Sequence, residues 1–365
     1  MSDTRTKYWL AAFAVFFAIL WLLNEILFPF IAGIALAYLL DPVADLLERW
    51  KFSRWLAAGL LTFLMVLTVI AAFLLLIPLL QSQISEIALK APKYFDIIQG
   101  HIQELFSILQ AQFADSNVGS LKDKIANLDQ PDLFGWVGSF LKGVWGGGIA
   151  LLNIFSLMII TPIVLFYLLR DWDLIVKSVD SWLPRHHQNV IQKQVREIDE
   201  VLSAFVRGQF LVCVLLGLFY ATSLTLVSLD FGFIVGFFTG LLSFIPYFGM
   251  LIGLIVAISI ATAQFAEWQT VGIVAGIFVL GQFVEGNFVT PKLVGEKIGL
   301  HPVWVILSLL AGGSLFGFTG ILLAIPTAAV IGVLGRFGIS HYKNTRAFTG
   351  LKENPSEEQE DRLKE

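Results

Sequence analysis

Long apolar runs recur along the chain and restrict what it can fold into. Of the 365 residues, 57% are hydrophobic and only 14% are charged. A soluble domain carries about a quarter charged residues, whereas roughly 20 consecutive apolar residues can cross the hydrocarbon core of a bilayer. We therefore predict an all-α polytopic membrane protein with about eight transmembrane helices, in contact with the lipid bilayer. The predicted spans are 8–24, 26–40, 55–80, 146–169, 205–229, 231–262, 268–284 and 303–335.

Charge placement predicts how the chain is oriented. Short loops on the side of both termini are rich in Lys and Arg, so the positive-inside rule places both termini in the cytoplasm. The N-terminal apolar run lacks the small-residue cleavage pattern of a signal peptide and is interpreted as a retained helix. The formal net charge of -4 is small and spread out, and it indicates no nucleic-acid partner.

The segments between the spans have helical character of their own. Apolar residues recur at three- and four-residue steps in 81–110 and 171–183, which predicts one amphipathic helix on the non-cytoplasmic side and one at the cytoplasmic interface. Asp41 and Pro42 are typical of a helix N-cap followed by a first-turn proline. The expected organisation is a three-helix membrane region (1–80), a non-cytoplasmic amphipathic segment (81–145), a fourth span (146–169), cytoplasmic interfacial helices (170–204), a glycine-rich transport core (205–338) and a disordered cytoplasmic tail (339–365).

Two predicted spans, 231–262 and 303–335, are too long for plain crossings and are interrupted by glycine and proline. Unwound backbone at membrane depth is tolerated only where it is buried in protein or faces a cavity, and paired broken helices favour a central translocation site. The alternatives are a proline kink in a tilted helix, or re-entrant hairpins without a transport role. The candidate path residues at the interruptions are Pro246, Gly249, Gly312 and Gly313.

Few ionisable residues lie near the apolar runs. Glu285 follows the seventh run directly, and a carboxylate in hydrocarbon costs on the order of 3 kcal/mol, so it should face protein, water or the interface. Asn287 and Gln282 could help to hold solute hydroxyls or ions beside it. Arg207, just inside the fifth span, is a further candidate. The alternatives are a solvated glutamate at a loop end and an arginine that extends to the interface.

Enzyme and metal-site signatures are missing from the sequence. It contains no HExxH, no GxSxG and no GxxxxGK[ST] motif. The single cysteine, Cys213, lies in an apolar run and is assigned to packing. We expect no catalytic residue, no metal site and no cofactor. Any active transport would then use an ion gradient, the membrane potential or another subunit.

The order of several segments resembles the autoinducer-2 exporter (AI-2E) family of bacterial membrane proteins. They are PFIAGIALAYLLDPVADLLER (29–49), FVRGQF (205–210), GLLSFIPYFGMLIG (240–253) and EGNFVTPKLVGEKIGLHPVWVILSLLAGGSLFGFTGILLAIPTAAV (285–330). The resemblance covers nearly the whole chain except the 81–140 region and the tail. It implies a permease of the bacterial inner membrane with about eight spans that forms a homo-oligomer, a pentamer. The family motif falls on Pro246, Gly249, Glu285, Asn287, Pro291, Gly295, His301 and Pro302.

Three functions remain open at this point. The first is a secondary transporter that exports a small polar solute such as the quorum-sensing signal autoinducer-2, with Glu285 as its leading titratable group. The second is a sodium or lithium/proton antiporter on the same scaffold, with a monovalent cation as substrate. The third is a non-transporting membrane scaffold that binds partners through its long segments outside the membrane.

Overall fold

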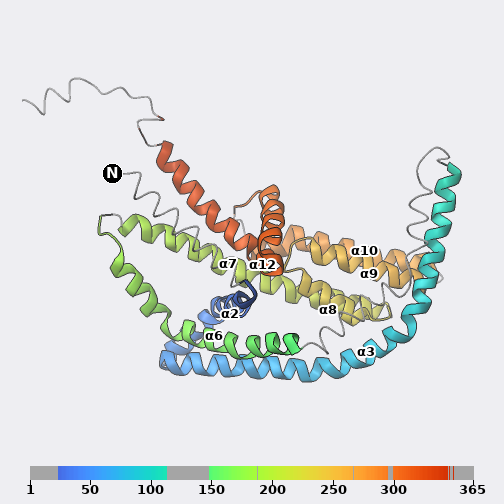
Figure 1. Cartoon of the computed structure of the whole chain (residues 1–365), viewed down its shortest axis with the longest axis horizontal. Helices are drawn as coiled ribbons and strands as arrows, with labels where there is room; N and C mark the ends of the chain where they lie inside the picture. Colours follow the sequence, from blue (N-terminus) through green and yellow to red (C-terminus); the bar gives the residue numbers. More distant parts are fainter. Residues whose placement is uncertain are drawn as a thin grey trace, which may run out of the picture. The chain divides into compact units, whose positions relative to one another are not determined.

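The structure, a computed structural model, describes residues 24–112, 148–186, 188–265, 267–294 and 299–343, together with Thr345 and Phe348. Every regular element in these ranges is a helix (Figure 1). Five of these helices are long and apolar enough to cross a membrane, and two shorter apolar helices accompany them. The all-α polytopic prediction is therefore confirmed. The predicted span 8–24, apart from Asn24, and the tail beyond Phe348 lie outside the described residues.

The chain divides into two compact units. The first comprises Met1–Val176 and Ala204–Glu296, and the second comprises Lys177–Ser203 and Lys297–Glu365. The interrupted span 231–262 belongs to the first unit and 303–335 to the second. A single central site formed by both interruptions therefore stays a prediction.

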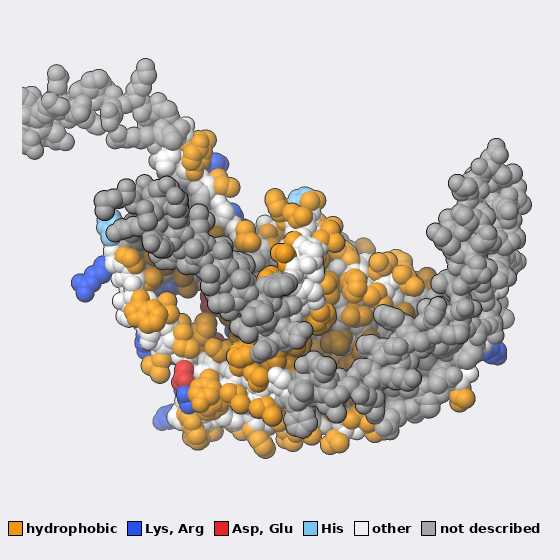
Figure 2. Space-filling view, viewed as in Figure 1, with side chains coloured by type: hydrophobic (Ala, Val, Ile, Leu, Met, Phe, Trp, Pro, Cys, Tyr) orange, Lys and Arg blue, Asp and Glu red, His pale blue; other side chains and the backbone are white. Residues whose placement is uncertain are grey.

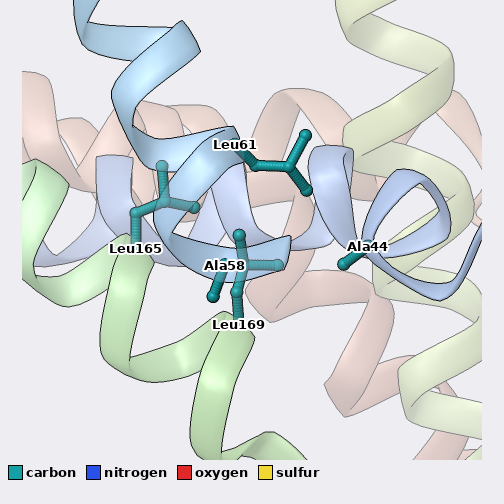
Figure 3. Close-up of a cluster of buried hydrophobic side chains, with 5 residues drawn as sticks. All are labelled: Ala44, Ala58, Leu61, Leu165 and Leu169. Carbon is teal, nitrogen blue, oxygen red and sulfur yellow. The ribbon is translucent and has the colours of Figure 1, made fainter. Parts of the chain in front are cut away.

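Three helices of the first unit share a small apolar core. They are α2 (Asn24–Arg49), α3 (Arg54–Gln112) and α6 (Gly148–Trp182). Figure 3 shows the core, in which small alanine side chains from α2 and α3 meet leucines from α3 and α6. Much of the remaining apolar side-chain surface is exposed (Figure 2), as expected for helices that face lipid. The core residues are Ala44, Ala58, Leu61, Leu165 and Leu169.

The prediction that Asp41 caps a helix is wrong. Helix α2 continues through Asp41 and Pro42 to Arg49, because Ala44 extends its buried face beyond the proline. Asp41 instead accepts a hydrogen bond from Arg54, the first residue of α3, at 2.7 Å. Arg54 also donates to the Leu169 carbonyl at 2.7 Å, so one guanidinium joins α2, α3 and α6.

Helix α3 is continuous over 59 residues, so the helix predicted at 81–110 is a direct extension of the span 55–80 (Figure 1). Lys90 and Tyr94 on this extension both donate to Asp230, the lysine at 2.6 Å, at the turn that follows α7. Burial opposes ionisation of Asp230, but the two donors outweigh it and hold the pKa of the carboxyl below its usual value. This contact joins the extension of α3 to the turn after α7 within the first unit.

The predicted interruption in span 231–262 is a helical hairpin. Helix α8 (Gly232–Leu242) and helix α9 (Phe248–Gln264) are joined by a turn that contains Pro246 and pack against each other. Tyr247 in the turn has a φ of 67°. A Cβ on Gly249 would overlap the Ser243 amide, so this glycine allows the two helices to meet at backbone distance. Span 231–262 is therefore discontinuous, with two short helices in place of one crossing.

The second interruption is also a hairpin. Helix α12 (Pro302–Lys343) reverses direction at Gly317, which has a φ of 57° and a ψ of -137°. Gly312 and Gly320 lie on either side of this bend and approach each other through their backbones. A Cβ added to Gly313 would lie 3.1 Å from Cγ1 of Ile321. The prediction that Pro302 begins this helix is confirmed.

Close glycine contacts hold α7 (Gln188–Leu226) against α8. Gly236 lies on the backbone of Ala221, and Gly240 lies on Gly217 and on the Cys213 carbonyl, where an added Cβ would come within 2.9 Å of the oxygen. Gly272 and Gly276 share the same four-residue spacing, yet neither has another described atom within 4 Å of an added Cβ. Spacing alone therefore does not identify the glycines that allow a close crossing inside the chain.

We expect Gly240→Ala to destabilise the protein by about 2 kcal/mol, because the added methyl overlaps backbone that cannot move independently. Gly276→Ala is the matched control and should be neutral or stabilising, since its methyl meets open space and alanine favours helix. The midpoint of thermal unfolding in detergent measures both. Equal midpoints for the two variants would contradict the crossing.

Candidate functional site

Glu285 lies in a helix and not in a loop. The seventh predicted span, α10 (Trp268–Val284), continues without a break into a π-helical turn, η1 (Glu285–Val289), and a short helix, α11 (Thr290–Leu293). Glu285 is the first residue of the turn, and only 8% of its surface is exposed. The alternative of a solvated glutamate at a loop end does not describe this position.

The π-helical turn changes the backbone pairing around Glu285. The Thr290 amide donates to the Glu285 carbonyl five residues earlier, which is one residue more than in an α-helix. A π-turn inside an α-helix accommodates an extra residue at some cost in stability, and such turns occur frequently at functional sites. The turn is thus a local weak point in the helix that carries the buried carboxylate.

Helix α7 packs against the helix that carries Glu285. Gly281 on α10 packs against the ring and hydroxyl of Tyr220, and Gly208 packs against the carbonyl of Leu293 on α11. The earlier residue of α7, Gly208, meets the later residue of the other helix, Leu293, and the number of residues between the two contacts is the same on both helices. Helix α7 and the α10–η1–α11 helix therefore run antiparallel. Glu285 lies between the contacts and interacts electrostatically with Cys213 and Tyr220. A carboxylate, a thiol and a phenol thus share one buried interface.

Two polar groups in this interface lack a partner among the described residues. Within its described ranges the structure gives no hydrogen bond or ion pair to the carboxylate of Glu285, which is 8% exposed. The fully buried Tyr220 hydroxyl has no hydrogen-bond partner there. Elsewhere on α10, the buried side-chain oxygen of Gln282 also has no hydrogen-bond partner among the described residues. A buried polar group without a partner costs about 1–3 kcal/mol, and a charged one costs more. Side chains that persist in such places are candidates for function.

The turn between α8 and α9 connects to this interface through Gln209. Gln209 is buried on α7, one turn before Cys213, and donates to the Ser243 carbonyl at 2.7 Å. Gly249, two residues beyond Tyr247 in the same hairpin, packs on the Ser243 amide. The structure therefore brings the predicted Pro246–Gly249 interruption to the same stretch of α7 that faces Glu285.

Other predicted path residues point elsewhere. Asn287 is exposed, and its amide donates to the Phe283 carbonyl of its own helix at 2.8 Å. Pro291 is exposed in the first turn of α11. Arg207 donates to the Tyr38 carbonyl at 2.8 Å and so joins α7 to α2. Gly312 and Gly313 belong to the second unit, and Gly295 lies outside the described residues.

Sequence reasoning missed Tyr220 and assigned Cys213 to packing alone. The available signal was a phenol in the middle of an apolar run, because a buried tyrosine hydroxyl ordinarily needs a partner. That signal alone does not say which distant residue the ring meets.

A described cavity of the first unit lies away from this interface. It has a volume of about 290 Å³ and lies where α9 and α10 meet, lined by Ile97, Gln264, Trp268 and neighbouring residues. None of its lining residues belongs to the Glu285 interface. Gln264 at the cavity already pairs with the backbone of Ser228 and Asp230, whereas the buried Tyr220 hydroxyl at the interface has no described partner.

Fold and site together define a class. The chain is a multi-pass α-helical membrane protein with helical hairpins in its apolar region and a carboxylate buried between helices. Helices of this kind, broken by glycine and proline, are typical of secondary transporters.

Comparison with known proteins agrees with this class and narrows it. The model of the AI-2E family transporters matches residues 10–337, and the chain belongs to that family. YrrI of Bacillus subtilis is 29% identical over 315 residues, covering 86% of this chain and 87% of its own. PerM of Escherichia coli is 23% identical over 344 residues, covering 90% and 92%. The AI-2 transport protein TqsA of Escherichia coli is 27% identical over 314 residues, covering 84% of each.

We expect Glu285→Gln to raise the free energy of unfolding by about 1 kcal/mol, because it keeps the side-chain shape and removes a buried charge without a described partner. Glu267→Gln, at the exposed start of the same helix, is the matched control and should have no effect. Thermal unfolding in detergent measures both variants. A lower midpoint for Glu285→Gln would mean that the carboxylate makes a stabilising contact.

Proposed function

We propose that this family transporter is a secondary transporter that exports a small polar solute such as AI-2, and that Glu285 is its central polar group. The observation that carries the proposal is the burial of Glu285, 8% exposed and unpaired among the described residues. A charge in that position needs a proton, a cation or a solute donor to compensate it. The relative TqsA is named for transport of AI-2, which supports this substrate.

The geometry suits a site that opens between α7 and α10. At Gly281 the two helices are close, but the glycine itself contributes little contact area. The π-turn at Glu285 is a weak point in the helix. Separation of the two helices at this level would expose the carboxylate to a solute from one side of the membrane. Because the sequence has no nucleotide-binding motif, an ion gradient or the membrane potential would drive export.

We place the protein in the bacterial inner membrane with both termini in the cytoplasm, on the basis of its Lys and Arg distribution. The resemblance to the family supports a homo-oligomer, a pentamer. The exposed apolar side chains on the described helices leave ample surface for lipid and for neighbouring copies.

The two alternatives have less support. The relatives reported above provide nothing in favour of sodium or lithium/proton antiport. Membership of a family of transporters argues against a non-transporting scaffold, and likewise against an enzyme.

Transport by the purified protein in liposomes tests the proposal. We expect efflux of labelled AI-2 under an imposed proton or sodium gradient, and at least a tenfold loss of rate in Glu285→Gln because the solute or coupling ion loses its charged partner. Glu267→Gln should transport like the native chain. An undiminished rate in Glu285→Gln would refute the role of Glu285. Sodium-dependent proton movement without AI-2 efflux would instead favour the antiporter.

A further inference from the structure

The ring of Tyr220 is held rigidly on α7. It is fully buried and stacks on Phe278 of α10 with ring centroids 4.8 Å apart and an interplanar angle of 22°. The ring of Phe219 makes an edge contact with the Tyr220 ring, with the two centroids 5.3 Å apart. On the remaining side, Gly281 leaves no space for even a methyl group beside the Tyr220 hydroxyl. Packing thus fixes where the phenolic oxygen lies, without any hydrogen bond to hold it among the described residues.

This fixed hydroxyl contacts α10 at a backbone position one helical turn before Glu285. Gly281, which contacts the hydroxyl, precedes Glu285 by four residues and so lies on the same face of the helix. Tyr220 and Glu285 interact electrostatically, but no hydrogen bond joins them. The interface therefore presents a phenol, which can donate or accept, and a carboxylate, which accepts when ionised, close together and without a described partner.

The ionisable groups described at this interface are acidic, and no basic side chain accompanies them. Glu285 interacts with the Cys213 thiol and the Tyr220 phenol, and no Lys or Arg of the described ranges pairs with it. The nearest basic residue along α7, Arg207, is held by the Tyr38 carbonyl of α2. An anionic solute would meet the carboxylate without a compensating cation, whereas a neutral hydroxylated solute could donate to Glu285 and accept from Tyr220.

We propose that Tyr220 is a specificity-determining residue: with Glu285 it selects neutral, hydroxyl-bearing solutes and rejects anionic ones. The proposal rests on the transport function proposed above and names the substrate class for the same site. Tyr220 supplies the fixed donor, and Glu285 supplies the acceptor and excludes negative charge. Phe219 belongs to α7, so its edge contact stays with the phenol when α7 and α10 separate.

Uptake kinetics in proteoliposomes test this role. Tyr220→Phe removes only the hydroxyl, and we expect it to raise the KM for labelled AI-2 at least tenfold while the maximal rate changes less than twofold. Tyr167→Phe, at an exposed tyrosine of α6 away from this interface, is the matched control and should leave both values unchanged. A purely structural role would instead lower the maximal rate through loss of folded protein.

Competition by two probes of one carbon skeleton provides a second readout on the native protein. Ribitol, which is neutral, should inhibit AI-2 uptake at least tenfold more strongly than ribonate, its carboxylate counterpart. Equal inhibition by the two, or an unchanged KM in Tyr220→Phe, would overturn the assigned selectivity while leaving transport itself intact. Absence of AI-2 uptake by the native chain would refute the proposed function and this inference with it.

Discussion

The close approach of α7 to α8, α10 and α11 is the constraint on which the functional region depends. Glycines at the contacts let backbones meet where the lipid environment provides no hydrophobic force between helices. Gly240 meets Gly217, Gly281 meets Tyr220, and Gly208 meets Leu293. Glu285 and Tyr220, which lie at or between these contacts, are buried. The burial of Glu285 is a consequence of this packing.

A buried carboxylate, a fixed phenol and a π-turn at one level of an interface form a consistent arrangement. The packing that stabilises the helices also leaves Glu285 and Tyr220 without described partners, so stability and function compete at this position. The π-turn, a weak point in the backbone of this helix, begins at Glu285, the carboxylate that a bound ligand would stabilise. In transport, the solute would bind Glu285 and Tyr220 from one side of the membrane and leave them on the other side.

Local pattern was enough to predict the helices but not their contacts. Apolar run length predicted the spans, and the glycine and proline interruptions predicted breaks where the hairpins at Pro246 and Gly317 lie. The continuity of α3 and of α10 into η1 was missed, because charged residues in 81–110 and after Val284 resembled boundaries. The pairing of Tyr220 with Gly281 joins distant parts of the chain, and nothing local to either residue indicates it.

The most direct test of the central claim uses Cys213, the only cysteine of the chain, as a probe beside Glu285. Its rate of labelling by N-ethylmaleimide in proteoliposomes reports access to the interface, and Cys213→Ser gives the background. If solute binds between α7 and α10, saturating AI-2 should change that rate at least severalfold relative to buffer alone. An identical labelling rate with and without AI-2, in protein that transports AI-2, would show that the solute passes elsewhere.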